Sequence, residues 1–166
     1  MNTIRYDNPS LTCRYGKGKN PTRIIPTNRL EIPKDAIILN DGVPTIIITT
    51  EMNREKAKEY EVYHNVGFVF AGQENIDFTE AFSKLENKYN IHTIMLEGGG
   101  TLNWTLIDKN LVSEIIIIRL PIIIGGKDNV SLVDGEGYTE CKFAKKFNLK
   151  RVEFRGNVTI NNYVRA

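Results

Sequence analysis

The chain has 166 residues, of which 41% are hydrophobic and 25% charged, and its formal net charge is +2 at pH 7. This length favours one domain covering residues 1–166, and the composition excludes a disordered or low-complexity chain. Because lysines and arginines are scattered among acidic residues, we expect no nucleic-acid partner. The longest apolar stretch, Ile115–Ile124, is interrupted by Arg119 and Pro121, so we expect no membrane span.

Targeting and metal-binding patterns are missing from the sequence. Met1–Arg5 contains no apolar signal region, and the two cysteines, Cys13 and Cys141, lie far apart. The only histidines are His64 and His92, and there is no paired-cysteine motif. We therefore expect no metal site and no disulfide framework, which fits a cytoplasmic protein.

The N-terminal third of the chain predicts loops followed by strands. Prolines and glycines punctuate residues 1–35, where only Thr22–Ile25 predicts a short strand. Ala36–Leu39 is a short apolar run, and Thr45–Thr49 is a β-branched run typical of a buried strand. Helix formers over Glu51–Glu61 predict a surface helix.

The middle of the chain alternates between strands and helices. Val66–Phe70 predicts a strand, and Asp77 is placed to cap the next helix. The apolar stripe of that helix consists of Phe78, Phe82, Leu85 and Tyr89. His92–Leu96 predicts another buried strand, and Thr101–Asp108 predicts a helix directly after three glycines. This alternation indicates a parallel sheet.

The C-terminal part indicates antiparallel strands. Glu114–Leu120 and Pro121–Ile124 are β-rich, while Lys150–Phe154 and Val158–Val164 flank a hairpin signal at Arg155–Asn157. The predicted fold class is α/β, with a mixed sheet that is parallel in its centre and ends in an antiparallel C-terminal hairpin. Helices are expected on both faces.

The sharpest local motif is a glycine turn, Glu97–Asn103, with the sequence EGGGTLN. Glycine lets the backbone approach a ligand closely, and a helix start offers unpaired N–H groups to a phosphate. Glu97 would lie at the carboxyl end of the preceding strand, where open α/β sheets bind ligands. A tight strand-to-helix turn capped by Thr101 explains the same residues, so both interpretations stay open. The motif is not the GxGxxG pattern of dinucleotide-binding folds.

Three weaker motifs allow structural interpretations. Arg14, in the segment Asp7–Arg14, could clamp a phosphate, although a solvated loop arginine is the simpler interpretation. Gly16–Pro21 lacks the spacing of a phosphate-binding loop and indicates a basic turn. Pro121–Gly126 indicates a bulge or a close backbone approach to a ligand. No hydrolase motif built on serine, cysteine or metal is present.

These motifs, in this order, resemble one family. The matching segments are Asn2–Thr3, Asp7–Arg14, Asn20–Ile25, Pro44–Ile47, Glu97–Asn103, Leu111–Ile115 and Pro121–Gly126. The chain resembles, over nearly its whole length, the reductase domain of riboflavin biosynthesis, the RibD C-terminal type with a dihydrofolate-reductase-like fold. It is most similar to the archaeal ribosylaminopyrimidine phosphate reductases of that family.

The resemblance implies an NADPH-dependent oxidoreductase that reduces the ribosylamino group of a pyrimidine 5′-phosphate to the ribitylamino form. It implies cofactor-binding positions at Thr3, Asp7, Asn28, Gly98, Gly99, Gly100, Thr101, Leu102, Asn103 and Thr105. It implies substrate contacts at Leu11, Arg14 and Glu97, with Arg14 near the substrate phosphate. A homodimer is also implied, and no catalytic residue is assigned.

The resemblance begins inside the family's pattern. Family members carry a strand and a Ser-x-Asp-Gly-Lys-like segment ahead of the point matched by Asn2, so we expect that the reading frame begins upstream of Met1. Two alternative functions stay open beside the riboflavin reductase. One is a truncated, non-catalytic nucleotide-binding or assembly module, and the other is the same fold acting on another pyrimidine or pterin. Glu97 and Arg14 favour the riboflavin reductase, because a bare cofactor module needs neither.

Overall fold

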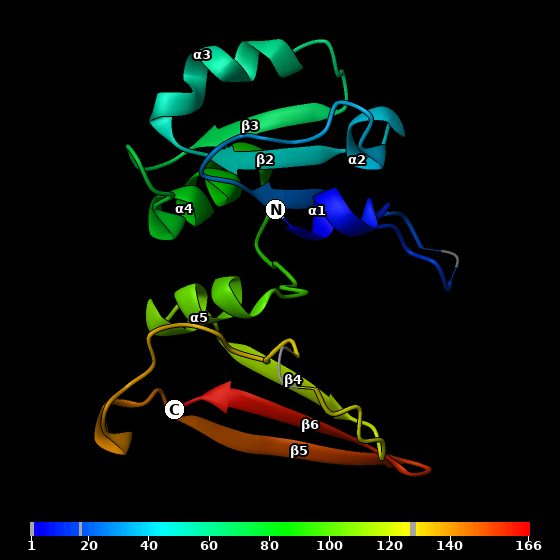
Figure 1. Ribbon diagram of the computed structural model, residues 1–166, viewed down its shortest axis with the longest axis vertical. Helices are drawn as coiled ribbons and strands as arrows, with labels where there is room; N and C mark the ends of the chain where they lie inside the picture. The colour runs from blue at the N-terminus through cyan, green and yellow to red at the C-terminus, as the bar shows by residue number, and fades with distance from the viewer. Residues whose placement is uncertain (1, 17, 127–128) are drawn as a thin grey trace. The chain divides into compact units, whose positions relative to one another are not determined.

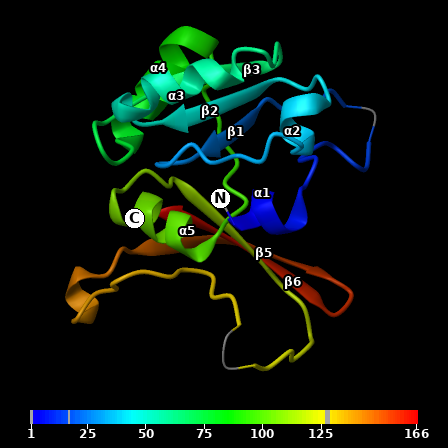
Figure 2. The same ribbon diagram turned by 45° about the horizontal axis from the view of Figure 1, so that its top comes forward.

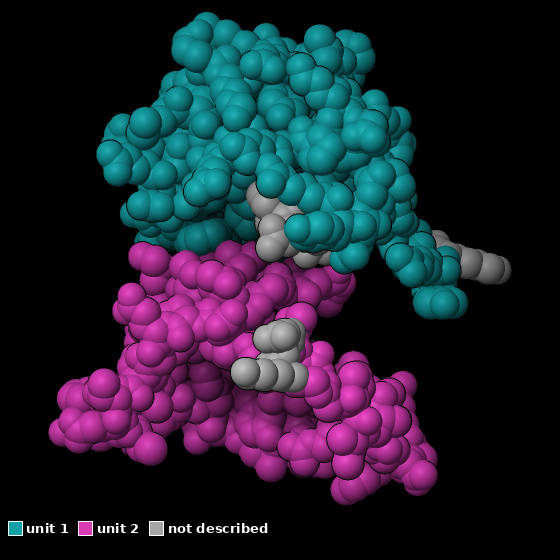
Figure 3. Space-filling view, viewed as in Figure 1, with its two compact units in different colours: residues 1–94 teal, residues 95–166 magenta. Residues whose placement is uncertain are grey.

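The computed structural model describes residues 2–16, 18–126 and 129–166, with the side chains of Asn2 and Thr3 outside the described part. The chain forms two compact units, residues 1–94 and 95–166 (Figure 3). Each unit contains one three-stranded sheet. Among the helices of the described residues, none is long and apolar enough to span a bilayer.

The first unit is built on a parallel sheet. Its strands, in the order β1-β2-β3, are β1 (Arg23–Pro26), β2 (Thr45–Thr49) and β3 (Val66–Phe70) (Figure 1). In the register, Ile47 of β2 lies between Ile25 and Phe68. Every residue of β2 is buried, which confirms the expected buried strand. A strand covered on both faces needs apolar side chains on both, and this explains the unbroken run of isoleucines.

Helices cover both faces of this sheet, as expected. One helical stretch consists of η1 (Glu51–Asn53), α3 (Arg54–Ala57) and η2 (Lys58–Tyr60), where the surface helix was predicted. Tyr60 contacts the ring of Phe68. On α4 (Phe78–Tyr89), the hydroxyl of Tyr89 lies 3.0 Å from the position that a Cβ atom added to Gly67 would take. Because neighbouring residues of a strand point to opposite faces, η2 and α4 pack on opposite sides of β3.

The ends of α4 have the caps that the sequence indicates. The carboxylate of Asp77 accepts hydrogen bonds from the backbone N–H groups of Thr79 and Glu80, at 2.9 and 3.2 Å. Asn90 ends the helix in the left-handed conformation, with φ of 54°. An Asn here satisfies the last carbonyl groups with little backbone strain.

The N-terminal segment contains structure that the loop prediction missed. A short helix, α1 (Asn2–Asp7), precedes β1, and the apolar run before Asn40 forms α2 (Ile37–Asn40). Ile4 of α1 is only 5% exposed and belongs to the same core cluster as Ile25 and Leu30. A single buried isoleucine therefore anchors a helix that is too short to show a periodic pattern.

The second unit is an antiparallel sheet with one longer helix. Its elements are α5 (Gly100–Asp108), β4 (Glu114–Arg119), η3 (Cys141–Phe143), β5 (Phe147–Arg155) and β6 (Val158–Arg165). The strand order is β4-β6-β5, and Figure 2 shows α5 beside this sheet. The predicted hairpin is confirmed, since β5 and β6 pair on either side of Gly156–Asn157.

Two predicted strands are wrong. His92–Leu96 and Pro121–Ile124 carry no strand, and most of their side chains are exposed. Extended backbone becomes a strand only when a neighbouring strand takes its hydrogen bonds, and no described strand pairs with either segment. The mixed α/β fold class is confirmed, with its parallel and antiparallel parts in two separate sheets among the described residues.

Candidate functional site

The glycine turn of the second unit forms the start of α5. Gly99 occupies the N-cap position with φ of 83°, and Gly98 has φ of 104°. No side chain caps the helix, so the interpretation of Thr101 as the cap is wrong. The first turn of the helix also carries no acidic residue. The N–H groups of this turn are therefore available to an anion, and the helix dipole favours one.

The three glycines of the turn face different surroundings. A Cβ added at Gly99 meets nothing within 4 Å, and one at Gly98 meets only the Asn103 amide at 3.8 Å. A Cβ at Gly100 would lie 2.7 Å from Cβ of Asp134. Gly98 and Gly99 thus present open backbone, whereas packing within the unit explains Gly100.

The polar side chains that follow the turn are engaged inside the second unit. Asn103 donates through Nδ2 to the carbonyl of Leu132 at 2.7 Å. The hydroxyl of Thr105 donates to the carbonyl of Thr101 at 2.8 Å, one helical turn back. The groups left for a ligand at this turn are therefore mainly backbone N–H groups.

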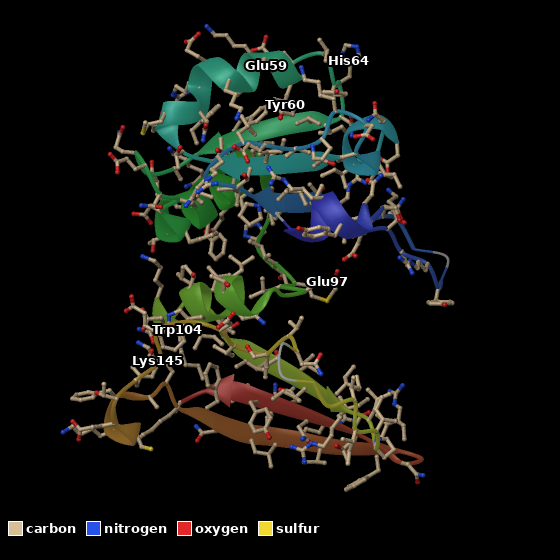
Figure 4. All side chains as sticks on the ribbon, in the orientation of Figure 1. Glu59, Tyr60, His64, Glu97, Trp104 and Lys145 are labelled. Atoms are coloured by element: carbon tan, nitrogen blue, oxygen red, sulfur yellow. The ribbon has the colours of Figure 1, made fainter. Side chains whose placement is uncertain are left out.

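Glu97 lies on the irregular segment before α5 and is exposed (Figure 4). Since His92–Leu96 is not a strand, Glu97 is not at the carboxyl end of one. No ion pair of Glu97 occurs within residues 2–16, 18–126 and 129–166. Its carboxylate is consequently free to accept hydrogen bonds from a bound molecule.

The other predicted substrate residues, Leu11 and Arg14, lie on one loop of the first unit, and the predicted cofactor residue Asp7 lies just before it. Asp7 is the last residue of α1 and is exposed, as is Arg14. Leu11 is half-buried against the core cluster and has φ of 49°. Arg14 has no acidic partner in the part of the chain that the structure describes. The prediction for Thr3 falls on a side chain outside the described part.

Three hydrogen bonds fasten this loop. The side-chain oxygen of Asn8 accepts from the backbone N–H of Ile37 at 2.9 Å. The backbone N–H of Cys13 donates to the Asn20 side chain at 3.1 Å. Between them, the carbonyl of Ser10 accepts from Nη1 of Arg23 at 2.8 Å. Residues 8–14 are called the substrate loop below.

Arg23 is a residue that the sequence reasoning passed over. Its side chain is 1% exposed, and its guanidinium makes a two-pronged ion pair with Asp41 at 2.7 Å for each oxygen. The hydrogen bond from Arg23 holds the pKa of the Asp41 carboxyl below its usual value. An arginine at the start of an apolar strand was the available signal, since a buried arginine requires partners.

Asn28, the cofactor position predicted beyond β1, is engaged with two neighbouring loops. Its side chain donates to Asn75 at 2.9 Å and accepts from the N–H of Ile76 at 3.1 Å. Asn53 donates to its backbone carbonyl at 2.7 Å. A cavity of about 460 Å³ lies here, lined by Asn28, Arg29, Glu31, Thr50, Met52, Asn53 and Glu74.

The predicted residues are therefore distributed over three places. The substrate loop is tied to Arg23 at the beginning of β1, and Asn28 follows the end of that strand. Glu97 and the glycine turn belong to the second unit. The cavity at the carboxyl ends of β1 and β2 is in the region where parallel sheets bind ligands. Arg29, which lines it, was not predicted.

Comparison with known proteins decides the family. The family model described as RibD C-terminal domain matches residues 1–160. The chain belongs to this family. The resemblance to the RibD C-terminal domain, drawn from motifs that include Asp7–Arg14 and Glu97–Asn103, is thus confirmed.

Named relatives match most of the chain. A protein of Aquifex aeolicus, named 2,5-diamino-6-ribosylamino-4(3H)-pyrimidinone 5′-phosphate reductase, is 39% identical over 162 residues, which cover 97% of this chain and 72% of that protein. A protein of the same name from Methanothermobacter thermautotrophicus is 33% identical over 166 residues, covering 98% of this chain and 76% of that protein.

Solved structures confirm the fold. RibD of Acinetobacter baumannii matches with a TM-score of 0.77 at 18% identity, covering 99% of this chain and 45% of that chain. The riboflavin biosynthesis reductase Rib7 of Saccharomyces cerevisiae matches with a TM-score of 0.71 at 21% identity, covering 99% of this chain and 72% of that chain. The chain spans about half the length of the RibD chain.

Proposed function

We propose that this chain is an NADPH-dependent reductase of riboflavin biosynthesis. It converts the ribosylamino group of a pyrimidine 5′-phosphate to the ribitylamino form. The observation that carries the proposal is the uncapped glycine turn at Gly98–Gly99, which opens α5 without an acidic residue in its first turn. The names of the relatives with 39% and 33% identity support the same reaction.

The turn fits the pyrophosphate of a dinucleotide. Gly98 and Gly99 leave the backbone uncovered, so a phosphate can approach within hydrogen-bond distance of the N–H groups of α5. Bound NADPH supplies a hydride, which the protein cannot supply itself. Asp7 and Asn28 are proposed as further cofactor contacts.

The substrate residues divide by chemistry. Arg14 presents a permanently charged, exposed guanidinium that can take the 5′-phosphate with two parallel hydrogen bonds. Leu11 offers an apolar side chain, which packs against the core cluster and extends from a backbone with φ of 49°. Glu97 can accept hydrogen bonds from the amino groups of the pyrimidine. In the reaction, C1′ gains the hydride and the ring oxygen of the sugar gains a proton, so that the ring opens.

Turnover by the purified chain tests the proposal. The chain is mixed with NADPH and the ribosylamino-pyrimidine 5′-phosphate, and the ribitylamino product is measured against the NADPH consumed. We expect one product for each NADPH. Arg14→Ala should raise the substrate KM at least about tenfold, because a charge-assisted phosphate contact is lost. The matched control is Arg155→Ala, an exposed arginine at the end of β5.

Two other results would reject the reductase. If the folded chain binds NADPH but makes no product, the chain is a nucleotide-binding module. If a folded sample does not bind NADPH, the assignment of the glycine turn fails as well. Titration calorimetry with NADPH and NADH separates these cases and measures the preference between the two cofactors.

We further propose that the protein is a cytoplasmic homodimer. The supporting feature is β4, where Ile116 and Ile118 are 61% and 59% exposed. Among the described strands, β4 pairs only with β6, so it is an apolar edge strand. Such edges are usually covered or carry charges, because they otherwise aggregate. Sedimentation velocity should give the mass of two chains, and Ile118→Lys should give the mass of one.

A further inference from the structure

The guanidinium of Arg23 is buried and fully hydrogen-bonded. Nε donates to the Thr45 hydroxyl at 3.0 Å, and Nη2 donates to the carbonyls of Ile38 and Val43 at 3.0 and 2.7 Å. Asp41 receives one hydrogen bond from each of Nη1 and Nη2. The remaining donor of Nη1 reaches the Ser10 carbonyl at 2.8 Å. No freedom is left for the plane of the guanidinium to turn.

One of these acceptors differs from the others. Thr45, Ile38, Val43 and Asp41 all belong to the stretch from α2 to β2, which is close to Arg23 in the first unit. The carbonyl of Ser10 belongs to the substrate loop. Since the other contacts fix the guanidinium, the hydrogen bond to Ser10 transmits that rigidity to the loop.

We propose that Arg23 is a positioning residue of the reductase: it holds the Ser10 carbonyl so that Leu11 and Arg14 are preset for the phosphorylated substrate. The inference rests on the proposed function of the substrate loop.

The backbone beside the anchor shows why an anchor is needed. Leu11, the residue after Ser10, has φ of 49°, and Asn8 has φ of 39°. A leucine in the left-handed region is strained and persists only where the surroundings hold it. The anchors at Asn8 and Cys13 involve exposed partners, whereas Arg23 is buried. Arg23 is therefore the rigid support of the loop.

A pair of substitutions separates positioning from stability. In Arg23→Lys, the compact ammonium can keep the ion pair with Asp41, but it cannot also reach the acceptors that the guanidinium fork spans. The matched control is Thr45→Val, which removes the acceptor of Nε inside the same buried network and does not touch the loop. Both variants lose stability, and only Arg23→Lys frees the Ser10 carbonyl.

Kinetics give the first readout. Arg23→Lys should raise the KM for the pyrimidine phosphate about tenfold while kcat changes less than about twofold, because binding geometry and not chemistry is disturbed. Thr45→Val should leave both constants within about twofold of the wild type. An equal KM in the two variants would overturn the proposal.

Hydrogen exchange gives a readout that does not need turnover. In Arg23→Lys, the amides of residues 10–14 should exchange at least about tenfold faster than in Thr45→Val, at matched fractions of folded protein. Unchanged exchange in the substrate loop would overturn the positioning role. Absence of turnover in the wild type would instead reject the reductase and leave this result standing. If Arg23→Lys does not fold, Asp41→Asn takes its place, because it loosens the guanidinium while keeping the arginine; it should produce the same loop exchange.

Discussion

The backbone N–H of Asp134 donates a 3.0 Å hydrogen bond to the carbonyl of Gly100. A Cβ at Gly100 would also lie 2.7 Å from Cβ of Asp134 and 3.0 Å from the carbonyl of Ser131. The segment around Asp134 therefore packs directly on the first residue of α5. Glycine is required at this position because the segment around Asp134 leaves no room for a Cβ atom. This requirement does not depend on any ligand at the neighbouring Gly99.

Replacing Gly100 should lower the stability of the second unit. The added methyl group of Gly100→Ala must displace backbone atoms, which costs about 2 kcal/mol in a packed site. Urea unfolding measures the loss. Gly18→Ala is the control, because its Cβ meets nothing within 4 Å; its free energy of unfolding should change by less than about 0.5 kcal/mol. Equal stability of the two variants would contradict the packing argument.

Replacing Gly99 should weaken NADPH binding beyond its effect on stability. Gly99→Ala places a Cβ on open backbone at φ of 83°, which costs about 1–2 kcal/mol in strain. Gly137→Ala carries a similar strain, with φ of 72° and nothing within 4 Å, but lies outside the turn. Calorimetry should show about tenfold weaker NADPH binding for Gly99→Ala alone. Equal affinities in both variants would show that the turn does not contact the cofactor.

The strands that sequence predicted correctly are those whose partners the local pattern implies. Every residue of Thr45–Thr49 is β-branched and buried, and the strand lies between two others. The turn signal at Gly156–Asn157 brings β5 and β6 together. His92–Leu96 has a similar apolar run but pairs with no described strand. Whether an extended segment becomes a strand depends on a distant partner, which a local pattern does not contain.

The site residues show the same difference between features with a local signal and features that depend on a distant partner. The motif at Gly98–Gly99 predicts a turn before a helix from the residue types alone, and the structure places it there. The ion pair of Arg23 and Asp41 joins residues 18 positions apart. Arg23 stands out at the start of an apolar strand, but nothing in its own segment identifies Asp41 as its partner, so the pair becomes visible only after β1 and α2 are folded against each other.

Tyr138 should remain protonated in strongly alkaline solution. Burial raises its pKa to about 12, with a further contribution from its hydrogen bond to Asp108 at 2.7 Å. Because the folded pKa lies above the unfolded value of 10.0, this group stabilises the fold below pH 10 and the contribution is lost as the pH rises toward 12. Asp108→Asn should lower the pKa.

The chain contains seven tyrosines, so the titration of Tyr138 must be isolated by difference. The ultraviolet absorbance of tyrosinate is measured against pH for the wild type and for Tyr138→Phe, and the difference gives the curve of Tyr138. The same difference is then taken in the Asp108→Asn background. An unchanged midpoint would show that Asp108 does not contribute.

Acid should destabilise the protein in part through Asp41. Its pKa lies below the ordinary 3.8 because the Arg23 guanidinium donates hydrogen bonds to the carboxylate, against a smaller opposing effect of burial. A lowered folded pKa means that the contribution to stability is complete above 3.8 and is lost as the pH falls through the folded value. Asp41→Asn leaves the Arg23 charge buried without its counter-charge, so we expect a loss of about 3 kcal/mol at neutral pH.

The acid dependence identifies the group responsible. Urea unfolding is measured from neutral pH to about pH 3 for the wild type, Asp41→Asn and Asp35→Asn, an exposed aspartate two residues before α2. The free energy of unfolding should fall less steeply below about pH 4 in Asp41→Asn, because the group that takes up the proton is gone. Asp35→Asn should keep the wild-type slope, since the fold holds that carboxylate in no ion pair within the described ranges. Parallel curves for all three proteins would assign the acid sensitivity to other carboxylates and remove Asp41 as the partner that fixes Arg23.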